Sequence, residues 1–317
     1  MANITAQDVA ALRAKTGLGM MDCKKALVEA DGDQEKAIKI LREKGLATAA
    51  KKESRIAAEG VVAIKTIGNI SAIIEVNTET DFVAKNASFL EFVDGLLETI
   101  IAKKPADVAA LEGCTFASSG MTVSAALTDK IAVIGEKISI RRFQIVEGTV
   151  STYVHGRVNP AVAAGGAGVI VKFEGSEAAL SSEKFAEVGK NIALQIASGN
   201  PPTYIAKEDV PQSAIDEEVG IQVAAAKNDP KLANKPDEVL KKIVQGKMDK
   251  LFFEKVCLNE QLYVKDDSMK VGAYLKASAK ELGGDIKVVQ FVLFEKGEGI
   301  QKREENFAEE IAKLAGK

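Results

Sequence analysis

The sequence predicts an α+β fold: a small helical module, then an α+β core present as two copies, each with a small antiparallel sheet. Apolar residues follow a helical spacing up to about residue 58 and change to a strand pattern from Gly60 onward. The second half of the chain repeats the pattern of the first half, which indicates an internal duplication. A further helical stretch interrupts the second copy, and a last helix ends the chain.

The N-terminal module, residues 1–55, is expected to contain three helices packed as a compact bundle. Thr5 is a candidate N-cap of the first helix, and Gly17-Leu18-Gly19 interrupts the chain before the second. We expect the third helix to end at Gly45, because glycine favours the left-handed conformation that follows many helices. Residues 47–58 are rich in Ala, Lys and Arg and predict a helical linker to the core.

The first copy of the core is expected over residues 56–148. Its first two strands are short apolar runs, and Gly68-Asn69 between them is typical of a tight turn. The expected elements, in chain order, are strands over 61–64 and 70–76, a helix with its apolar face from Phe89 to Ile100, a helix over 123–134 and a strand over 138–146.

The second copy, residues 149–204 and 259–299, follows from two ungapped offsets within the sequence. An offset of 96 residues aligns apolar positions: Ile73-Ile74 with Val169-Ile170, Phe89 with Phe185, Leu96 with Ile192 and Ile100 with Ile196. An offset of 148 residues aligns six identical residues: Val123 with Val271, Leu127 with Leu275, Gly135 with Gly283, Ile138 with Ile286, Phe143 with Phe291 and Glu147 with Glu295. So many identities in one register favour duplication over chance.

The two offsets differ by 52 residues (148 − 96), so the second copy carries an insertion, which we place at residues 205–258. Proline-containing breaks divide this segment into two helical stretches, which predicts an inserted helical hairpin. The hairpin is either a spacer or a surface for a partner or for self-association, and the pattern favours neither. Residues 300–317 are expected to form a C-terminal helical module, with an amphipathic helix over 304–314.

The composition favours binding over catalysis. The chain has one histidine, His155, three separated cysteines and no GxxxxGK[ST] segment, so nothing supports a histidine-based catalytic group, a zinc site or a P-loop. Gly165, Gly166 and Gly168 precede a strand, whereas a dinucleotide fingerprint must follow one. We therefore expect no catalytic residue, no cofactor and no metal.

Charge and hydropathy limit the partners. The net charge is −3, aromatic residues are 5 % and Trp is absent, which disfavours direct binding of nucleic acid. No apolar stretch is long enough to cross a membrane, and no basic start followed by an apolar run is visible. The expected location is cytoplasmic, or an organelle matrix after processing.

The segment TDFVAKN, Thr80 to Asn86, lies between a strand and a helix. In one interpretation Thr80 or Asp81 caps the helix and Phe82 packs into the core. The offset of 96 residues supports a second interpretation of the segment. Thr80 and Asp81 align with Ser176 and Glu177, which are similar in kind, whereas Phe82 aligns with Ala178. An aromatic residue needed only to close the shared scaffold should have a counterpart, so Phe82 is expected to protrude.

Five segments are similar to those of the elongation factor Ts family, and the resemblance runs over essentially the whole chain. They are TGLGMMDCKKAL (Thr16 to Leu27), AAKKESRIAAEG (Ala49 to Gly60), EVNTETDFVAKN (Glu75 to Asn86), IGEKISIRRF (Ile134 to Phe143) and FEKGEGI (Phe294 to Ile300). The segment before Met121 and residues 157–166 look longer than the usual bacterial pattern, which leaves surface contacts there open.

The resemblance implies a guanine nucleotide exchange factor that binds elongation factor Tu, both GDP-bound and nucleotide-free, and disturbs its magnesium and phosphate site. It implies a ubiquitin-associated-like (UBA-like) module at the N-terminus and a homodimer within a heterotetramer in some members. The implied partner-binding residues are Thr80, Asp81, Phe82 and Val83 for the element that enters the partner, and Arg13, Met20, Met21 and His155 as secondary contacts.

Three other functions are kept open for comparison. A translation-linked RNA-binding protein is weakly favoured by 11 Lys or Arg against 9 Asp or Glu in residues 1–60. A ubiquitin-like interaction scaffold would depend on the N-terminal module alone. A nucleotide-using enzyme would have to bind GDP by itself.

Overall fold

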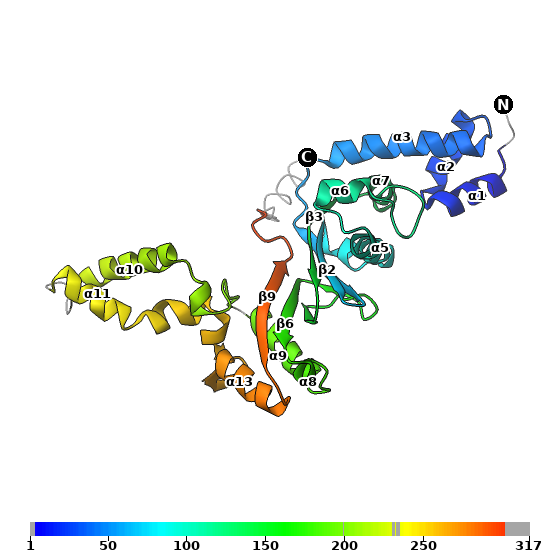
Figure 1. Cartoon of the computed structure of the whole chain (residues 1–317). Helices are drawn as coiled ribbons and strands as arrows, with labels where there is room; N and C mark the ends of the chain where they lie inside the picture. Colours follow the sequence, from blue (N-terminus) through cyan, green and yellow to red (C-terminus); the bar gives the residue numbers. More distant parts are fainter. Residues whose placement is uncertain (1–3, 199, 230–231, 233–234, 302–317) are drawn as a thin grey trace.

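The computed structural model describes residues 4–198, 200–229, 232 and 235–301 and places a helical module, a two-sheet core and a projecting helical hairpin in sequence (Figure 1). The predicted α+β class, with small antiparallel sheets, is confirmed. The C-terminal helix predicted over 304–314 lies outside the described residues. The domain boundaries and the UBA-like character of the first module stay predictions.

The N-terminal module consists of α1 (Ala6–Thr16), α2 (Met20–Glu29) and α3 (Gln34–Lys52). Thr5 caps α1 as predicted, since its hydroxyl accepts from Asp8 N–H while the Asp8 carboxylate accepts from Thr5 N–H. The module has its own small core, formed by the buried residues Val9, Leu12, Cys23, Ala26, Leu27, Ala30, Ala37 and Leu41. It is therefore a separate apolar cluster at one end of the molecule (Figure 1).

The predicted end of the third helix at Gly45 is wrong, because α3 continues to Lys52. Gly45 is buried, and a Cβ built on it would lie 3.5 Å from Ala132 Cβ and 3.8 Å from Thr128 Cγ2. Both of these residues belong to α7 (Val123–Ile134). These distances are ordinary van der Waals contacts, so α3 packs on α7 at this position and joins the module to the core.

The first copy of the core has a sheet with strand order β3-β2-β1-β5. Its strands are β1 (Glu59–Ile67), β2 (Ile70–Thr78), β3 (Ile138–Glu147) and the two-residue β5 (Ala164–Gly165). β1 and β2 form the predicted hairpin, in which Gly68 has a φ of 61°. One face of the sheet is covered by α5 (Ala87–Lys103), α6 (Val108–Gly113) and α7, whose apolar residues pack with Ile74 and Val76.

The second copy has a three-stranded sheet with the order β4-β6-β9, and β4 was not among the expected elements. Its strands are β4 (Val150–His155), β6 (Ala167–Gly175) and β9 (Ile286–Glu295). The helices α9 (Phe185–Ala197) and α13 (Val271–Glu281) pack on it through Ile192 and Leu275. A short helix follows the middle strand in both copies: α4 (Asp81–Ala84) after β2 and α8 (Glu177–Leu180) after β6.

The structure corrects one of the two sequence offsets. The offset of 148 holds throughout, since α7 and β3 begin at residues 123 and 138 whereas α13 and β9 begin at 271 and 286. The short helices are 96 residues apart, but the strands before them are 97 apart: Glu75 pairs with Arg142, whereas Lys172 pairs with Gln290. A one-residue error in a strand assigns each side chain to the opposite face, so Ile73 corresponds to Ile170 and not to Val169.

The two sheets pack face to face. Their shared interior contains the buried residues Val62, Ile64, Ile73, Val146, Ile170, Val292 and Phe294. The helices of each copy lie on the outer face of its own sheet, which gives a helix-sheet-sheet-helix arrangement. The core is therefore a double layer of sheets from which turns project.

The inserted hairpin extends away from the core (Figure 1). Its helices α10 (Gln212–Lys227) and α11 (Asp237–Gln245) pack through Val223, Leu240 and Val244, and Met248, which follows α11, joins this cluster. The chain returns to the core through a π-helical segment (Asp249–Phe253), α12 (Glu254–Val256), a 3-10 turn (Leu258–Glu260) and the small strands β7 (Leu262–Tyr263) and β8 (Asp266–Lys270). Another 3-10 turn (Lys207–Asp209) precedes α10.

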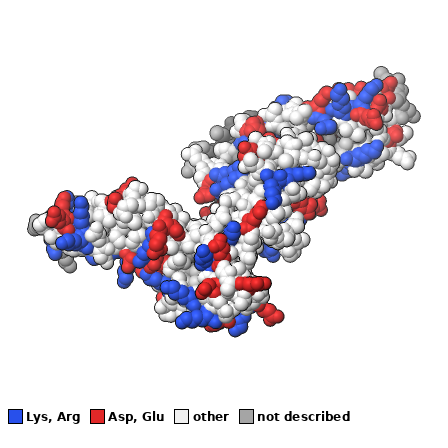
Figure 2. Space-filling view, in the orientation of Figure 1, with Lys and Arg blue, Asp and Glu red and all other residues white. Residues whose placement is uncertain are grey.

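Acidic and basic side chains are interspersed over the face of the molecule seen in Figure 2, with neither sign forming a broad patch there. Within the described part of the chain, no helix combines the length and the apolar character needed to cross a membrane.

Candidate partner-binding site

The TDFV segment forms a projecting tip at the end of β2. Phe82 has an exposed fraction of 81 %, whereas the next residue, Val83, is 7 % exposed and belongs to the core of the first copy. Ala84 is buried as well. The short helix α4 therefore has one anchored side and presents the Phe82 ring outward. Val83, expected among the partner-binding residues, is instead packed inside the chain and holds the tip in place.

The N-cap interpretation of this segment is wrong for Thr80 and for Phe82. Thr80 precedes α4, but its side chain makes no capping hydrogen bond, and Phe82 does not enter the core. The Thr80 hydroxyl donates instead to Glu136 Oε1 at 2.7 Å, and Thr80 N–H donates to Glu136 Oε2 at 3.0 Å. The cap of the following helix is Asn86, whose side chain accepts from Ser88 N–H and Phe89 N–H.

The base of the tip is tied to two other segments. Glu79 Oε1 accepts from Lys137 N–H at 2.5 Å, and the Glu79 carboxylate pairs with Arg55 at 3.2 Å. The Thr78 hydroxyl donates to Thr80 O at 2.8 Å. Arg55 follows the last helix of the N-terminal module, so these bonds connect the tip to the linker as well as to the turn between α7 and β3.

Asp81 is exposed and is paired within its own turn. Lys85 Nζ lies 2.8 Å from Asp81 Oδ2. The hydrogen bond from Lys85 lowers the pKa of Asp81, and the charges of Lys85 and of Lys296 act in the same direction. Asp81 is thus a carboxylate beside the exposed aromatic ring, and its cation is an exposed surface lysine.

A buried carboxylate, Glu75, fixes the segment after β9 beside the strand that leads to the tip. Its oxygens accept from Gly297 N–H at 2.8 Å, Arg141 Nη1 at 2.9 Å, Arg142 Nε at 2.7 Å and Asn77 Nδ2 at 3.1 Å. Burial would raise the pKa of Glu75, but these donors outweigh it and lower the pKa below its ordinary value. Lys296, in the same segment, pairs with Glu59 at the start of β1.

The predicted secondary contacts of the N-terminal module lie on its surface. Met20 and Met21, at the start of α2, have exposed fractions of 54 % and 63 %. Arg13 is exposed in the last turn of α1. These residues belong to a different unit from the tip, so a partner must span the module and the first copy to touch both (Figure 1).

His155 is exposed at the end of β4, on the second sheet. Its Nδ1 lies 3.3 Å from the Tyr153 hydroxyl, and its backbone O accepts from Gly166 N–H. The glycines around it have a packing role: a Cβ on Gly165 would lie 2.4 Å from His155 O, and one on Gly168 would lie 2.8 Å from Val62 Cγ1. The glycine-rich run therefore lets strands approach and is not a phosphate loop.

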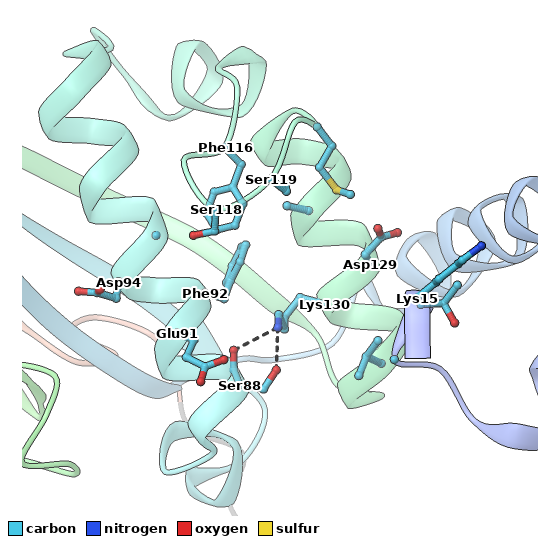
Figure 3. A pocket seen from close by; sticks show the side chains of 16 residues that line it. Lys15, Ser88, Glu91, Phe92, Asp94, Phe116, Ser118, Ser119, Asp129 and Lys130 are labelled. Atoms are coloured by element: carbon cyan, nitrogen blue, oxygen red, sulfur yellow. Dashed lines mark hydrogen bonds between the residues drawn. The ribbon is translucent and has the colours of Figure 1, made fainter. Parts of the chain in front are cut away.

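A cavity of about 640 Å³ lies between the end of α1, α5, the 116–121 segment and α7 (Figure 3). Within it Lys130 Nζ donates to Ser88 Oγ at 2.8 Å and to Ser88 O at 3.1 Å. Burial lowers the pKa of Lys130 and raises that of the neighbouring Asp129. The cavity is lined by residues of both the module and the core, and no residue of the TDFV segment is among them.

Sequence reasoning missed Glu79 and Glu136, the two glutamates that hold the tip. Glu136 lies 56 residues after Thr80, and no local pattern connects them. The sequence feature that could have pointed to Glu136 is its position directly after Gly135. This glycine ends a helix, and the second copy has Gly283 at the corresponding position.

The described residues contain no group of three or more His, Cys, Asp or Glu side chains placed to hold a metal ion. The described part of the chain combines a two-sheet core, a separate helical module and an exposed aromatic–acid tip. Such a molecule belongs to the class of proteins that act by docking on another protein.

Comparison with known proteins gives the particular family. Residues 79–298 match the family described as "Elongation factor TS". The chain is 46 % identical over 316 residues to the elongation factor Ts of Clostridium kluyveri, covering 98 % of each chain. It is 46 % identical over 317 residues to that of Clostridioides difficile, with 99 % of each chain covered, and 42 % identical over 314 residues to that of Syntrophotalea carbinolica, with 98 % and 99 % covered. The chain belongs to the elongation factor Ts family of translation factors.

Proposed function

We propose that this chain is a guanine nucleotide exchange factor that binds elongation factor Tu in its GDP-bound and nucleotide-free forms and accelerates GDP release. It performs no bond chemistry of its own and acts in the cytoplasm. Membership of the elongation factor Ts family supports the partner. The single observation that carries the mechanism is the 81 % exposure of Phe82 on an anchored turn.

The physical principle is coupling between two binding events. A GTPase holds GDP through magnesium-bridged phosphates and backbone N–H groups. A factor that binds better to the conformation in which these contacts are weakened raises the rate of GDP loss. By reciprocity, GDP must weaken binding of the factor by the same ratio, and equal affinity for both conformations would produce no shift.

The tip supplies the differential contact. The Phe82 ring can enter an apolar gap between helices of the partner, while Val83 and Ala84 keep its base fixed in the core. A fixed base matters because a mobile side chain would lose entropy on docking and push less effectively on the partner. Asp81, freed from Lys85, brings a negative charge or an acceptor to the place where magnesium is held.

The secondary contacts hold the partner without selecting one conformation. Met20 and Met21 offer flexible apolar surface on the module, beside Arg13, and His155 offers a ring on the second sheet. Contacts of this kind lower the concentration of factor needed for half-maximal exchange but do not raise the maximal rate. Variants at these positions should therefore change affinity, whereas variants of the tip should change the maximal rate.

Self-association through the hairpin, within a heterotetramer, stays a prediction. Ile221 on α10 and Val239 on α11 have exposed fractions of 55 % and 41 % and are suitable positions for charged substitutions. Sedimentation of these variants, alone and with the partner, measures the assembly directly.

The experiment that tests the function is release of a fluorescent GDP analogue from preloaded elongation factor Tu. Phe82→Ala should reduce the stimulated rate by an amount equivalent to ~1–4 kcal/mol, as loss of a buried aromatic anchor does. Ile67→Ala is the matched control, because Ile67 is a 48 % exposed apolar residue at the far end of the β1–β2 hairpin. Wild-type rates for Phe82→Ala would remove the tip from the mechanism, and no stimulation by the unaltered chain would reject the function.

A further inference from the structure

The turn that carries the tip differs between the two copies by one residue. The strand ends correspond, because Thr78 pairs with Ile138 and Gly175 pairs with Ile286, 148 residues later. In the second copy a single residue, Ser176, separates the strand end from α8. In the first copy two residues, Glu79 and Thr80, separate the strand end from α4. Because Thr80 corresponds to Ser176, Glu79 is the additional residue.

In the second copy this turn is closed directly on the neighbouring turn between α13 and β9. Ser176 N–H donates to Asp285 O at 2.9 Å, a bond between backbone groups. A Cβ on Gly284 would lie 1.8 Å from Ser176 Oγ, and one on Gly175 would lie 2.0 Å from Asp285 O. A side chain at Gly284 would meet the Ser176 side chain, and one at Gly175 would meet the backbone of Asp285, so the two turns are in direct contact.

In the first copy carboxylates stand between the same two turns. Glu136 occupies the position of Gly284, and it receives both the N–H and the hydroxyl of Thr80, at 3.0 and 2.7 Å. Glu79, the additional residue, receives Lys137 N–H at 2.5 Å, and Lys137 corresponds to Asp285. The backbone bond of the second copy is thus replaced by bonds through two side chains.

The anchor of the turn is the same in both copies. Val83 and its counterpart Ala179 are both buried, so the short helices are fixed to their cores in the same way. Phe82 and its counterpart Ala178 are both exposed. What distinguishes the first copy is therefore the large ring together with the two glutamates beneath it.

We infer that Glu79 and Glu136 are positioning residues that hold the Phe82 tip away from the core at the distance the partner requires. The inference rests on the proposed function for its effect on exchange, but its structural part is independent of it. Without the two bracing glutamates the tip would close on the turn after α7, as the second copy does, and Phe82 would lose reach. Displacing a reacting or docking group by about 1 Å can cost about a hundredfold in rate.

The structural part can be measured on the free protein. The chain has four tyrosines but no tryptophan, so Phe82→Trp places a single tryptophan on the tip, which can be excited selectively. Acrylamide should quench its fluorescence nearly as well as that of free tryptophan. Glu136→Gly, which introduces the residue of the second copy at this position (Gly284), and Glu79→Gly, which removes the carboxylate of the additional residue, should each reduce the quenching. Glu136→Gln keeps the side-chain length and one acceptor, so it should restore exposure. Unchanged quenching in both glycine variants would overturn the inference.

The functional part uses GDP release from the preloaded partner at saturating and at limiting concentrations of the factor. Glu136→Gly should lower the saturating rate by about tenfold to a hundredfold with little change in the half-maximal concentration, and Glu136→Gln should recover most of it. A variant that only unfolds the chain would instead lose affinity and circular dichroism together. Ser176→Ala, at the corresponding turn of the second copy, should leave the rate unchanged.

The outcomes separate the two proposals. A normal rate for Phe82→Ala rejects the tip mechanism itself. A slow Phe82→Ala variant combined with a normal saturating rate for Glu136→Gly overturns only the positioning role. If the Glu79→Gly variant does not fold, the Glu136→Gly and Glu136→Gln variants decide the question by the same comparison.

Discussion

Phe82 and Val83 are neighbours in the chain but have opposite environments, with exposed fractions of 81 % and 7 %. The short helix α4 produces this contrast, because one of its sides is anchored in the core and the other faces outward. In the proposed function, docking and stability are thus assigned to two consecutive residues. That separation makes each of them testable by itself.

Phe82→Ala should leave the free energy of unfolding within about 0.5 kcal/mol of the parent value, because an exposed side chain contributes little to the core. Val83→Ala should lower it by ~1–3 kcal/mol through lost burial and a small cavity. Urea denaturation followed by circular dichroism measures both. A Phe82→Ala variant as destabilised as Val83→Ala would show that the ring packs against its own chain.

The element positions were predictable where the signal is local. The helix over 123–134 was predicted with its observed bounds, since Thr122 caps its start and Gly135 ends it in the left-handed conformation. The end of the third helix was not predictable, because Gly45 serves a contact with Ala132 in another helix. A single sequence does not distinguish a glycine that ends a helix from a glycine inside a helix that packs against another helix.

The same division applies to the candidate site. Phe82 could be predicted as a protruding residue because the duplicated copy has Ala178 in its place. Glu136 could not be predicted, because its bonds to Thr80 depend on how two distant turns meet. The offset of 97 residues between the strands could not be predicted from an ungapped alignment either, because the first copy has one additional residue at the tip.

Gly45→Ala should stabilise the chain by ~0.5–1 kcal/mol. A methyl group at this position would be in ordinary contact with Ala132 and Thr128, at 3.5 and 3.8 Å, while alanine lowers the cost of forming the middle of α3. Gly45→Leu should instead destabilise it by ~1–3 kcal/mol, because the larger side chain pushes α3 away from α7. Thermal unfolding measures both. Equal effects of the two substitutions would mean that α3 does not pack on α7 in solution.

Glu75→Gln should flatten the dependence of stability on acid pH. The folded-state pKa of Glu75 is lowered from its ordinary value of 4.5, so its charged form stabilises the native state above that pH. The contribution is lost as pH falls below 4.5 through the folded-state pKa. Glutamine cannot titrate. Near neutral pH the substitution should lower the free energy of unfolding by about 2 kcal/mol, because two arginines lose their anionic acceptor.

Denaturation midpoints measured between about pH 6 and about pH 3 should therefore converge for the parent and the Glu75→Gln variant as the pH falls. Glu98→Gln is a suitable control, because Glu98 is a partly exposed carboxylate that pairs with Lys65 on the same copy. A constant difference between parent and Glu75→Gln across this range would contradict the assignment.

Cys257 should be far less reactive than Cys114 in the folded protein. Burial, with repulsion from Glu260, raises the pKa of the Cys257 thiol to about 11, so near pH 8 it carries about one hundredth of the thiolate of a thiol with the ordinary value of 9.0. Cys257 is buried at the base of the hairpin, where Leu258 N–H donates to Tyr204 O, so a thiol reagent can reach it only when the structure opens locally.

In a Cys23→Ser, Cys114→Ser variant, Cys257 is the remaining thiol that a disulfide reagent can modify. The rate of its modification should rise with pH and in low concentrations of urea. A rate equal to that of Cys114 in native buffer would mean that the hairpin base is open.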